Sequence, residues 1–164
     1  MRIQLKKTSL KPVEISSQFQ VKKLLLEGIE LEEKLKCYLS KFIVGILDPD
    51  TAGLKPDKFI SNLQKGILGD FSNRYIITAH DNNETIGILI GLPQKEQLLH
   101  IYSLHISPEY RYKGIGSTLL SQCINDMCAS NVTDLIIDVH MDNTPAYNLY
   151  KKFNFIEIID NNGE

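Results

Sequence analysis

The chain has 164 residues, enough for one domain with a substantial hydrophobic core. Apolar residues make up 43% of it and charged residues 23%, values that are typical of a globular protein. The net charge of −2 argues against a nucleic-acid-binding protein, and no apolar stretch reaches the length of about eighteen residues that predicts a membrane span.

Residues 1–12 contain basic side chains but lack the apolar segment of a secretory signal, so we expect a cytoplasmic protein. The three cysteines form no Cys-x-x-Cys pair, and we interpret them as structural thiols. The four histidines include no pair spaced four residues apart, so no metal cofactor is expected.

The first half of the chain predicts one strand followed by helices. Residues Arg2–Lys6 alternate as in a strand. We expect one helix around Phe19–Leu26 and a second over Leu31–Ile46, where apolar residues recur three and four positions apart. A further helix is expected to begin near Pro56, with its inner face reaching Ile67.

The second half predicts strands and helices in a regular order. Three β-rich segments joined by short turns should form an antiparallel meander, namely Tyr75–Ala79, Thr85–Leu92 and Leu98–Ser107. Helices and strands then alternate: a helix from Gly114 or Ile115 to Ala129, a strand over Leu135–His140, a helix over Pro145–Phe153 and a strand over Phe155–Ile159. The strand–helix–strand unit from Leu98 to Val139 implies a right-handed crossover between parallel strands. The predicted fold class is α+β, with a mixed, mostly antiparallel central sheet flanked by helices.

The segment between the third strand of the meander and the next helix has the features of an anion-binding loop. Gly114 and Gly116 follow a basic stretch at the point where the helix begins. Helix N-termini leave backbone N–H groups unpaired and carry about half a positive charge, so phosphate is their usual ligand. Leu119 stands where a dinucleotide fingerprint needs a third glycine, and Lys113 precedes the glycines instead of following them as in a Walker loop.

The pattern Arg-x-x-Gly-x-Gly that Arg111 forms with the two glycines resembles the acetyl-CoA pyrophosphate loop of the GNAT N-acetyltransferase superfamily. Asn143–Phe155 resembles the Asn-x-x-Ala-x-x-Leu-Tyr-x-x-x-Gly-Phe segment of the same family, with Asn154 in place of the usual glycine. Asparagine tolerates the left-handed conformation that a helix exit needs, so the departure is small. The resemblance extends over Leu98–Ile159, and the N-terminal half contains no motif that we can match.

The resemblance implies a single GNAT-like domain over residues 1–164 with the acyl-CoA N-acyltransferase fold. Its implied function is acetyl-CoA-dependent transfer of an acetyl group to a primary amine of a small molecule or a protein. In the family, the pantetheine arm lies between two splayed strands and pairs with backbone groups of one of them. The residues that the resemblance places at acetyl-CoA are Leu104, Ile106, Arg111, Tyr112, Lys113, Gly114, Gly116, Ser117 and Asn143.

Some of these residues have simpler interpretations that stay open. The charges of Arg111 and Lys113 are also those of an ordinary solvated loop, although the adjacent glycines favour pyrophosphate binding by Arg111. Asn143 would also serve as a helix cap, a position that asparagine fills well.

Two side chains are candidates for the chemistry of acetyl transfer. Tyr150 occupies the tyrosine position of the family, where it would protonate the departing CoA thiolate; the alternative is a packing residue whose hydroxyl pairs with backbone. His100 lies where related enzymes place a carboxylate base, and histidine titrates near neutral pH. The alternative for His100 is a sheet-face histidine without a role. His105 is the weaker candidate because its side chain should point away from the neighbouring core residues.

The alternative function is a catalytically inactive acyl-CoA-binding module with a regulatory role, and Tyr150 favours the enzyme. The expected partners are acetyl-CoA and an amine acceptor, without nucleic acid or membrane, and a homodimer stays open. The acceptor itself is not predicted, because the segment Leu10–Asn73, where the family selects its acceptor, contains no recognisable motif.

Overall fold

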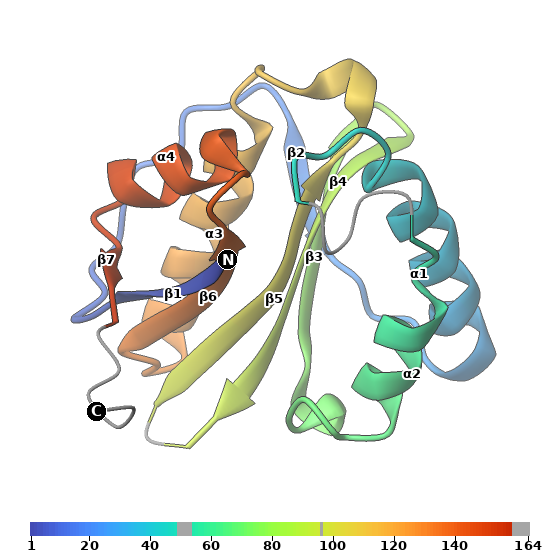
Figure 1. Cartoon of the computed structure of the whole chain (residues 1–164), viewed down its shortest axis with the longest axis horizontal. Helices are drawn as coiled ribbons and strands as arrows, with labels where there is room; N and C mark the ends of the chain where they lie inside the picture. The colour runs from blue at the N-terminus through green and yellow to red at the C-terminus, as the bar shows by residue number, and fades with distance from the viewer. Residues whose placement is uncertain (49–53, 96, 159–164) are drawn as a thin grey trace.

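A mixed β-sheet runs through the centre of the computed structural model, which describes residues 1–48, 54–95 and 97–158. Within these residues the sheet has seven strands, and helices cover both of its faces (Figure 1). The strands are β1 (Arg2–Lys7), β2 (Gln20–Lys23), β3 (Tyr75–Asp81), β4 (Glu84–Gln94), β5 (Leu98–Ile106), β6 (Asp134–His140) and β7 (Ile156–Glu157). The helices are α1 (Gly28–Phe42), α2 (Asp57–Gln64), α3 (Ile115–Ala129) and α4 (Thr144–Lys152), with short 3-10 turns at Phe71–Asn73 and Pro108–Tyr110.

The strands lie in the order β2-β3-β4-β5-β6-β1-β7. The meander of β3, β4 and β5 is confirmed, and β5 and β6 are parallel, as the crossover through α3 requires. The other strand pairs are antiparallel. The predicted fold class, α+β with a mixed, mostly antiparallel sheet flanked by helices, is therefore confirmed. The predicted last strand, Phe155–Ile159, shortens to β7, and Ile159 lies outside the described residues.

The helix predicted around Phe19–Leu26 is wrong, because this segment forms the edge strand β2, which pairs with β3. Phe19 and Val21, two positions apart, pack on the side of the sheet that α3 covers. Leu24 and Leu26 pack instead on the side of α1. A spacing of two is the period of a strand, so the apolar residues that suggested one helix divide between two faces.

Two predicted helices end earlier than expected. α1 ends before Ile46 and α2 ends before Ile67. In each case a glycine with a positive φ follows, Gly45 at 72° and Gly66 at 77°. This left-handed conformation breaks the helical hydrogen-bond pattern, so the apolar residues beyond each glycine belong to loops.

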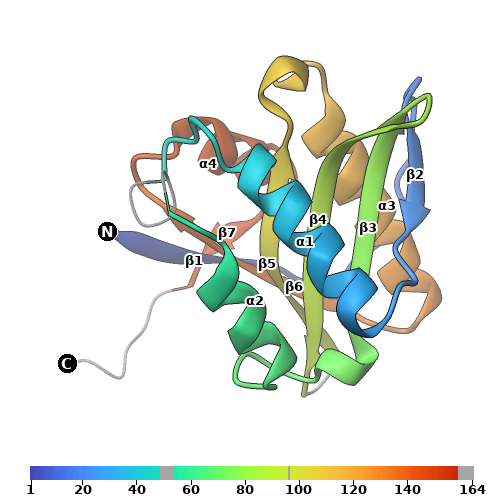
Figure 2. The same ribbon diagram turned by 90° about the vertical axis from the view of Figure 1, so that its right-hand side faces the viewer.

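Apolar side chains fill the space between the sheet and the helices α1 and α2. Leu31, Leu35 and Leu39 of α1 are buried at a spacing of four, which places them on one face of the helix. They belong to the same buried cluster as Ile88 and Ile90 of β4 (Figure 2 looks onto this face). This packing fixes α1 against the central strands.

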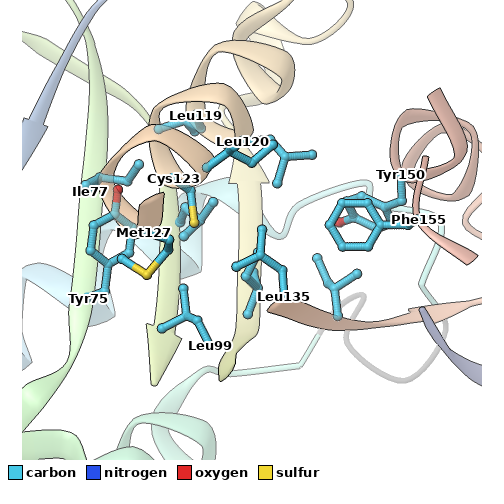
Figure 3. Packing of buried hydrophobic residues seen from close by; sticks show 14 of the residues in the cluster. Tyr75, Ile77, Leu99, Leu119, Leu120, Cys123, Met127, Leu135, Tyr150 and Phe155 are labelled. Atoms are coloured by element: carbon cyan, nitrogen blue, oxygen red, sulfur yellow. The ribbon is translucent and has the colours of Figure 1, made fainter. Parts of the chain in front are cut away.

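The opposite face of the sheet is covered by α3 and α4. Leu119 and Cys123 of α3 pack in the cluster drawn in Figure 3, together with Tyr75 of β3. Cys123 is fully buried, and burial raises the pKa of its thiol, as for a cysteine that serves as a core residue. The ring of Tyr150, from α4, lies beside that of Phe155 in the same cluster, with a centroid distance of 5.8 Å.

Two irregularities of β5 create the space for ligands. The pairing of β5 with β6 ends at Ile101, so the rest of β5 lies beyond the pairing with its parallel neighbour. The register between β4 and β5 also shifts, because Ile90 pairs with Ser103 whereas Gly91 pairs with Ile101. This bulge inserts Tyr102 as an extra residue, so that Ile101 before it and Leu104 after it both pack on the α3 side, whereas Tyr102 itself packs on the α1 side.

Candidate functional site

A first pocket lies between the end of β5 that no longer pairs with β6, the beginning of α3 and the helix α4. Nearly all the side chains that the sequence predicted for acetyl-CoA binding line it. They are Leu104, Ile106, Arg111, Tyr112, Gly114, Gly116, Ser117 and Asn143, together with Tyr150. Lys113 is not among the described residues of the lining, and its ammonium lies 5.2 Å from the centre of the Tyr110 ring. The structure thus gathers two sequence motifs into one cavity.

The two glycines of the loop serve different purposes. Gly114 is the N-cap of α3 with a φ of 82°, and a Cβ there would meet no atom within 4 Å. Its backbone therefore turns in the left-handed region, and no side chain covers the N-terminus of α3 at this position. A Cβ at Gly116 would lie 3.1 Å from Leu149, so this glycine permits the close approach of α4.

The beginning of α3 is suited to an anion. Gly114 supplies no capping side chain, and the first turn contains no acidic residue that would neutralise the positive end of the helix. The first N–H groups of α3 therefore remain for a ligand in the pocket. A phosphate is the usual guest of such a cradle.

Arg111 is committed to backbone carbonyls. Its Nη2 donates to the carbonyl oxygens of Phe42 at 2.8 Å and Val44 at 2.7 Å, and its Nε donates to that of Ile106 at 3.2 Å. The side chain therefore ties the end of β5 to the end of α1 and to the loop that follows. Residues 45–47 of that loop form a wall of the first pocket. Pyrophosphate binding by this guanidinium stays a prediction, and its contacts favour a tethering role.

We expect Arg111→Gln to lower the free energy of unfolding by about 2 kcal/mol, because hydrogen bonds to a charged donor are lost. Acetyl-CoA should also bind more weakly, since a wall of its pocket loses its anchor. Denaturant unfolding and calorimetry measure the two effects. Lys113→Gln is the matched control, because it removes the same charge from the same loop without breaking those bonds. Equal stability of the two variants would contradict the tethering role.

Asn143 and Tyr150 come from the two ends of α4. Asn143 stands at the N-cap of α4, but its side chain makes no capping hydrogen bond and instead lines the pocket. The Tyr150 ring is 4% exposed, and burial raises the pKa of its hydroxyl, so the hydroxyl keeps its proton at neutral pH. Within the described part of the chain this hydroxyl has no hydrogen-bond partner. The alternative from the sequence, a packing tyrosine whose hydroxyl pairs with backbone, therefore finds no such hydrogen bond among the described residues.

A second pocket lies on the α1 face of the sheet, between β5, β6 and the helices α1 and α2. Its volume of about 380 Å³ lies in the range of small-molecule sites. Apolar side chains of α1 and α2 form one wall, and Asp138 of β6 lies on the other. Lys55 and Lys58 contribute positive charge at the α2 side.

Asp138 is paired with His100. The Nε2 of His100 donates to a carboxylate oxygen of Asp138 over 3.0 Å, and the His100 ring stacks on Tyr102 at a centroid distance of 4.0 Å. The hydrogen bond from His100 is the main cause that lowers the pKa of Asp138, so the carboxylate is ionised. His100 itself is not among the described residues that line either pocket. The sequence prediction of His100 as the base stays untested, and its geometry connects it to a pocket through Asp138.

A family model described as the acetyltransferase (GNAT) family matches residues 41–155. The chain belongs to the GNAT family. The matched range contains the strands β5 and β6, the glycine loop at the start of α3, and α4 with Tyr150.

Similar proteins extend this comparison. An N-alpha-acetyltransferase of Sulfurisphaera tokodaii is 35% identical over 127 residues, which cover 77% of this chain and 62% of the relative. The chain thus spans 62% of the length of that curated GNAT relative. The PaiA N-acetyltransferase of Thermoplasma acidophilum, solved in complex with coenzyme A, superposes with a TM-score of 0.61 at 21% identity, covering 84% of this chain and 89% of the other. The ribosomal-protein-S18-alanine N-acetyltransferase of Escherichia coli gives a TM-score of 0.66 at 16% identity, with coverages of 87% and 80%.

Several parts of this GNAT site carried no signal in the sequence. The loop residues Gly45, Ile46 and Leu47 form a wall of the first pocket, although no motif marks them. Tyr102, the extra residue of the bulge in β5, lines the second pocket, and no motif marks it. His105, ranked below His100 from the sequence, lines both pockets.

Other features of the described residues bear on the remaining predictions. In the segments 1–48, 54–95 and 97–158, no group of three or more histidine, cysteine, aspartate or glutamate side chains is arranged to hold a metal ion. None of the helices in these segments combines the length and apolar character that a membrane crossing requires.

Proposed function

We propose that this GNAT protein is an acetyl-CoA-dependent N-acetyltransferase, with acetyl-CoA in the first pocket and a primary amine in the second. The main support for the proposal is that the two pockets share the lining residue His105 of β5. A thioester entering from one side and an amine entering from the other would come together there. Direct transfer between bound substrates needs such a meeting point.

The acetyl-CoA end of the proposal is supported by backbone groups. The start of α3 offers its unpaired N–H groups to the pyrophosphate, and Asn143 offers an uncommitted side-chain amide. The stretch of β5 beyond Ile101, which includes Leu104 and Ile106, no longer pairs with β6. Its backbone can therefore pair with the amide groups of a pantetheine arm, as it would with an added strand.

For the acceptor we propose the α-amino group of a polypeptide. The relatives at 35% identity are named N-alpha-acetyltransferases, and Asp138 offers an ionised carboxylate to the amine in a pocket that Arg2, Lys55 and Lys58 also line. An α-amino group has a lower pKa than a lysine side chain, so more of it is neutral and nucleophilic near pH 7. A site without a strong base therefore acts more readily on this class of amine.

We assign His100 an indirect role through Asp138. Its hydrogen bond holds the carboxylate in place and ionised, which favours docking of the acceptor amine. We expect His100→Ala to raise the KM for the acceptor about tenfold while kcat changes little. Steady-state kinetics with a varied acceptor concentration test this, and an unchanged KM would return His100 to a structural role.

Tyr150 is the proposed proton donor for the leaving group. The amine nitrogen attacks the acetyl carbonyl carbon, the C–N bond forms and the C–S bond breaks. The CoA thiolate then takes the hydroxyl proton of Tyr150, which lines the pocket and is free of partners in the described part of the chain. Such general acid assistance contributes about a hundred- to ten-thousand-fold to the rate.

A panel of acceptors tests the proposed substrate class. We expect the protein to acetylate short peptides with a free N-terminus, and to act at least about tenfold less on the same peptides blocked at the N-terminus but carrying a lysine. Small amines serve as a third group. Preference for the lysine side chain or for a small amine would overturn the acceptor class and leave the acetyl-CoA site intact.

A further inference from the structure

His105 stands where the two pockets meet. It lies near the end of β5, paired with Ile88 of β4, whose side chain belongs to the cluster beneath α1. The imidazole therefore faces the α1 side, away from Leu104 and the core that packs against α3. It contributes to the lining of the first pocket and of the second. Among the described residues it is the side chain that the two pockets share.

The imidazole of His105 is uncommitted, unlike the other histidines. His80 shares a hydrogen bond with Thr78 at 2.8 Å, and His100 binds Asp138. His140 shares one with the N-terminal amine at 2.9 Å. Within the described ranges, His105 has no hydrogen-bond or ion-pair partner. A half-buried polar ring without partners costs stability, and such a cost is typical of a group that binds a ligand.

The charged groups that act on His105 are Asp48 and Arg111. Arg111 is held by its three carbonyl contacts, and Asp48 forms an ion pair with Arg2 at 2.8 Å. Asp138 lines the same second pocket but is engaged by His100. Burial is the main cause that lowers the pKa of His105 to about 4, so the ring is neutral at pH 7, has a free lone pair on one nitrogen and holds an added proton only weakly.

We propose that His105 is the proton acceptor for the amine, a role that rests on the proposed transferase function. As the amine nitrogen bonds to the acetyl carbon, it becomes positively charged and must lose one proton. That proton goes to a ring nitrogen of His105, while the thiolate takes the proton of Tyr150. One C–N bond forms and one C–S bond breaks. One proton passes from the amine to His105, and one passes from Tyr150 to the thiolate. After the product leaves, His105 releases its proton to solvent and the Tyr150 phenolate takes one from solvent, which restores both groups.

The weak basicity of the buried ring is compatible with this role. A nitrogen that has added to a carbonyl carbon holds its proton less tightly than the free ammonium, so a weak base at the right position suffices. Position favours His105 over His100, because His105 lies on both pockets whereas His100 lies outside their lining and is bound to Asp138.

The test uses His105→Ala with added imidazole. We expect kcat to fall about a hundred-fold, with acetyl-CoA affinity within about twofold of the parent, because general base assistance is lost and binding is not. Free imidazole should restore activity in a saturable manner, since the deletion leaves room for it between the two pockets. His80→Ala is the control, because His80 lies on β3 outside the described lining of either pocket. It should keep the parent kcat and show no response to imidazole.

The inference is overturned if His105→Ala keeps a kcat within about threefold of the parent. It is also overturned if a folded His105→Ala protein loses activity but imidazole does not restore it. A parent-like kcat in His105→Asn would overturn it as well. The asparagine variant keeps a polar side chain but lacks a basic nitrogen, so it replaces His105→Ala if that variant binds acetyl-CoA poorly. A parent protein that transfers no acetyl group to any amine would overturn the proposed function instead. The two failures are therefore distinguishable.

Discussion

Replacing Gly114 with valine is expected to weaken acetyl-CoA binding at least about a hundred-fold, equivalent to about 2.7 kcal/mol. Gly114 has a φ of 82°, a conformation that β-branched residues rarely adopt. Its missing Cβ also leaves open the space in front of the first N–H groups of α3. A valine would strain the turn and fill the place of the pyrophosphate. Isothermal calorimetry with acetyl-CoA measures the loss.

Gly28→Val is the matched control for backbone strain. Gly28 has a φ of 58°, and a Cβ there would also meet no atom within 4 Å, but it stands at the start of α1, outside the described lining of both pockets. We expect this control to lose stability but to bind acetyl-CoA as the parent does. Unchanged acetyl-CoA affinity in a folded Gly114→Val protein would remove the basis for placing the pyrophosphate at α3.

Tyr150→Phe is expected to lower the turnover number at least about a hundred-fold while acetyl-CoA affinity stays near that of the parent. The substitution deletes a hydroxyl that lines the first pocket and has no hydrogen-bond partner among the described residues. No described protein group therefore loses a hydrogen-bond partner, and the packing of the ring against Phe155 remains. Stability should stay close to that of the parent, so the kinetic effect can be separated from unfolding.

Tyr147→Phe, on the same helix, serves as the control for Tyr150. The Tyr147 hydroxyl donates to Glu157 at 3.0 Å and is not among the described lining of the first pocket. Turnover in this variant should match the parent. If Tyr150→Phe keeps a turnover number within about twofold of the parent, Tyr150 is a packing residue and another group protonates the thiolate.

The lining of the first pocket, which we propose for acetyl-CoA, was predictable in part because its sequence signals are local. A glycine that must adopt a positive φ and a helix that begins directly after it lie within a few residues of each other. The loop around Gly114 could therefore be interpreted from the sequence, and the structure places it as the N-cap of α3. Asn143 and Tyr150 were found for the same reason, because a short helix fixes their spacing.

The second pocket, which we propose for the acceptor, was not predictable, because its residues meet only in the folded chain. Asp138 comes from β6, Leu39 from α1 and Phe59 from α2, and no pattern of spacing connects them. The bulge in β5 changes which side chains face α1, and it depends on pairing with β4 rather than on β5 alone. The sequence could not signal that His105 lines both pockets, since this placement is a property of the tertiary structure.

Arg111 shows a third kind of limit. The spacing Arg-x-x-Gly-x-Gly locates it beside the phosphate cradle, which suggested a phosphate ligand. Its donors instead reach carbonyls of Phe42 and Val44, from a segment far away in sequence. Pyrophosphate binding by Arg111 stays a prediction, and the spacing of the motif did not signal these additional contacts.

The most direct test of the central claim is mass spectrometry of a short peptide with a free N-terminus after incubation with the protein and acetyl-CoA. The account predicts a peptide that gains one acetyl group on its α-amine, with one free CoA released for each peptide modified, and no gain in the Tyr150→Phe protein over the same time. Tight acetyl-CoA binding without acetylation of any free amine across the acceptor panel would contradict it, and would indicate an acyl-CoA-binding module without transferase activity.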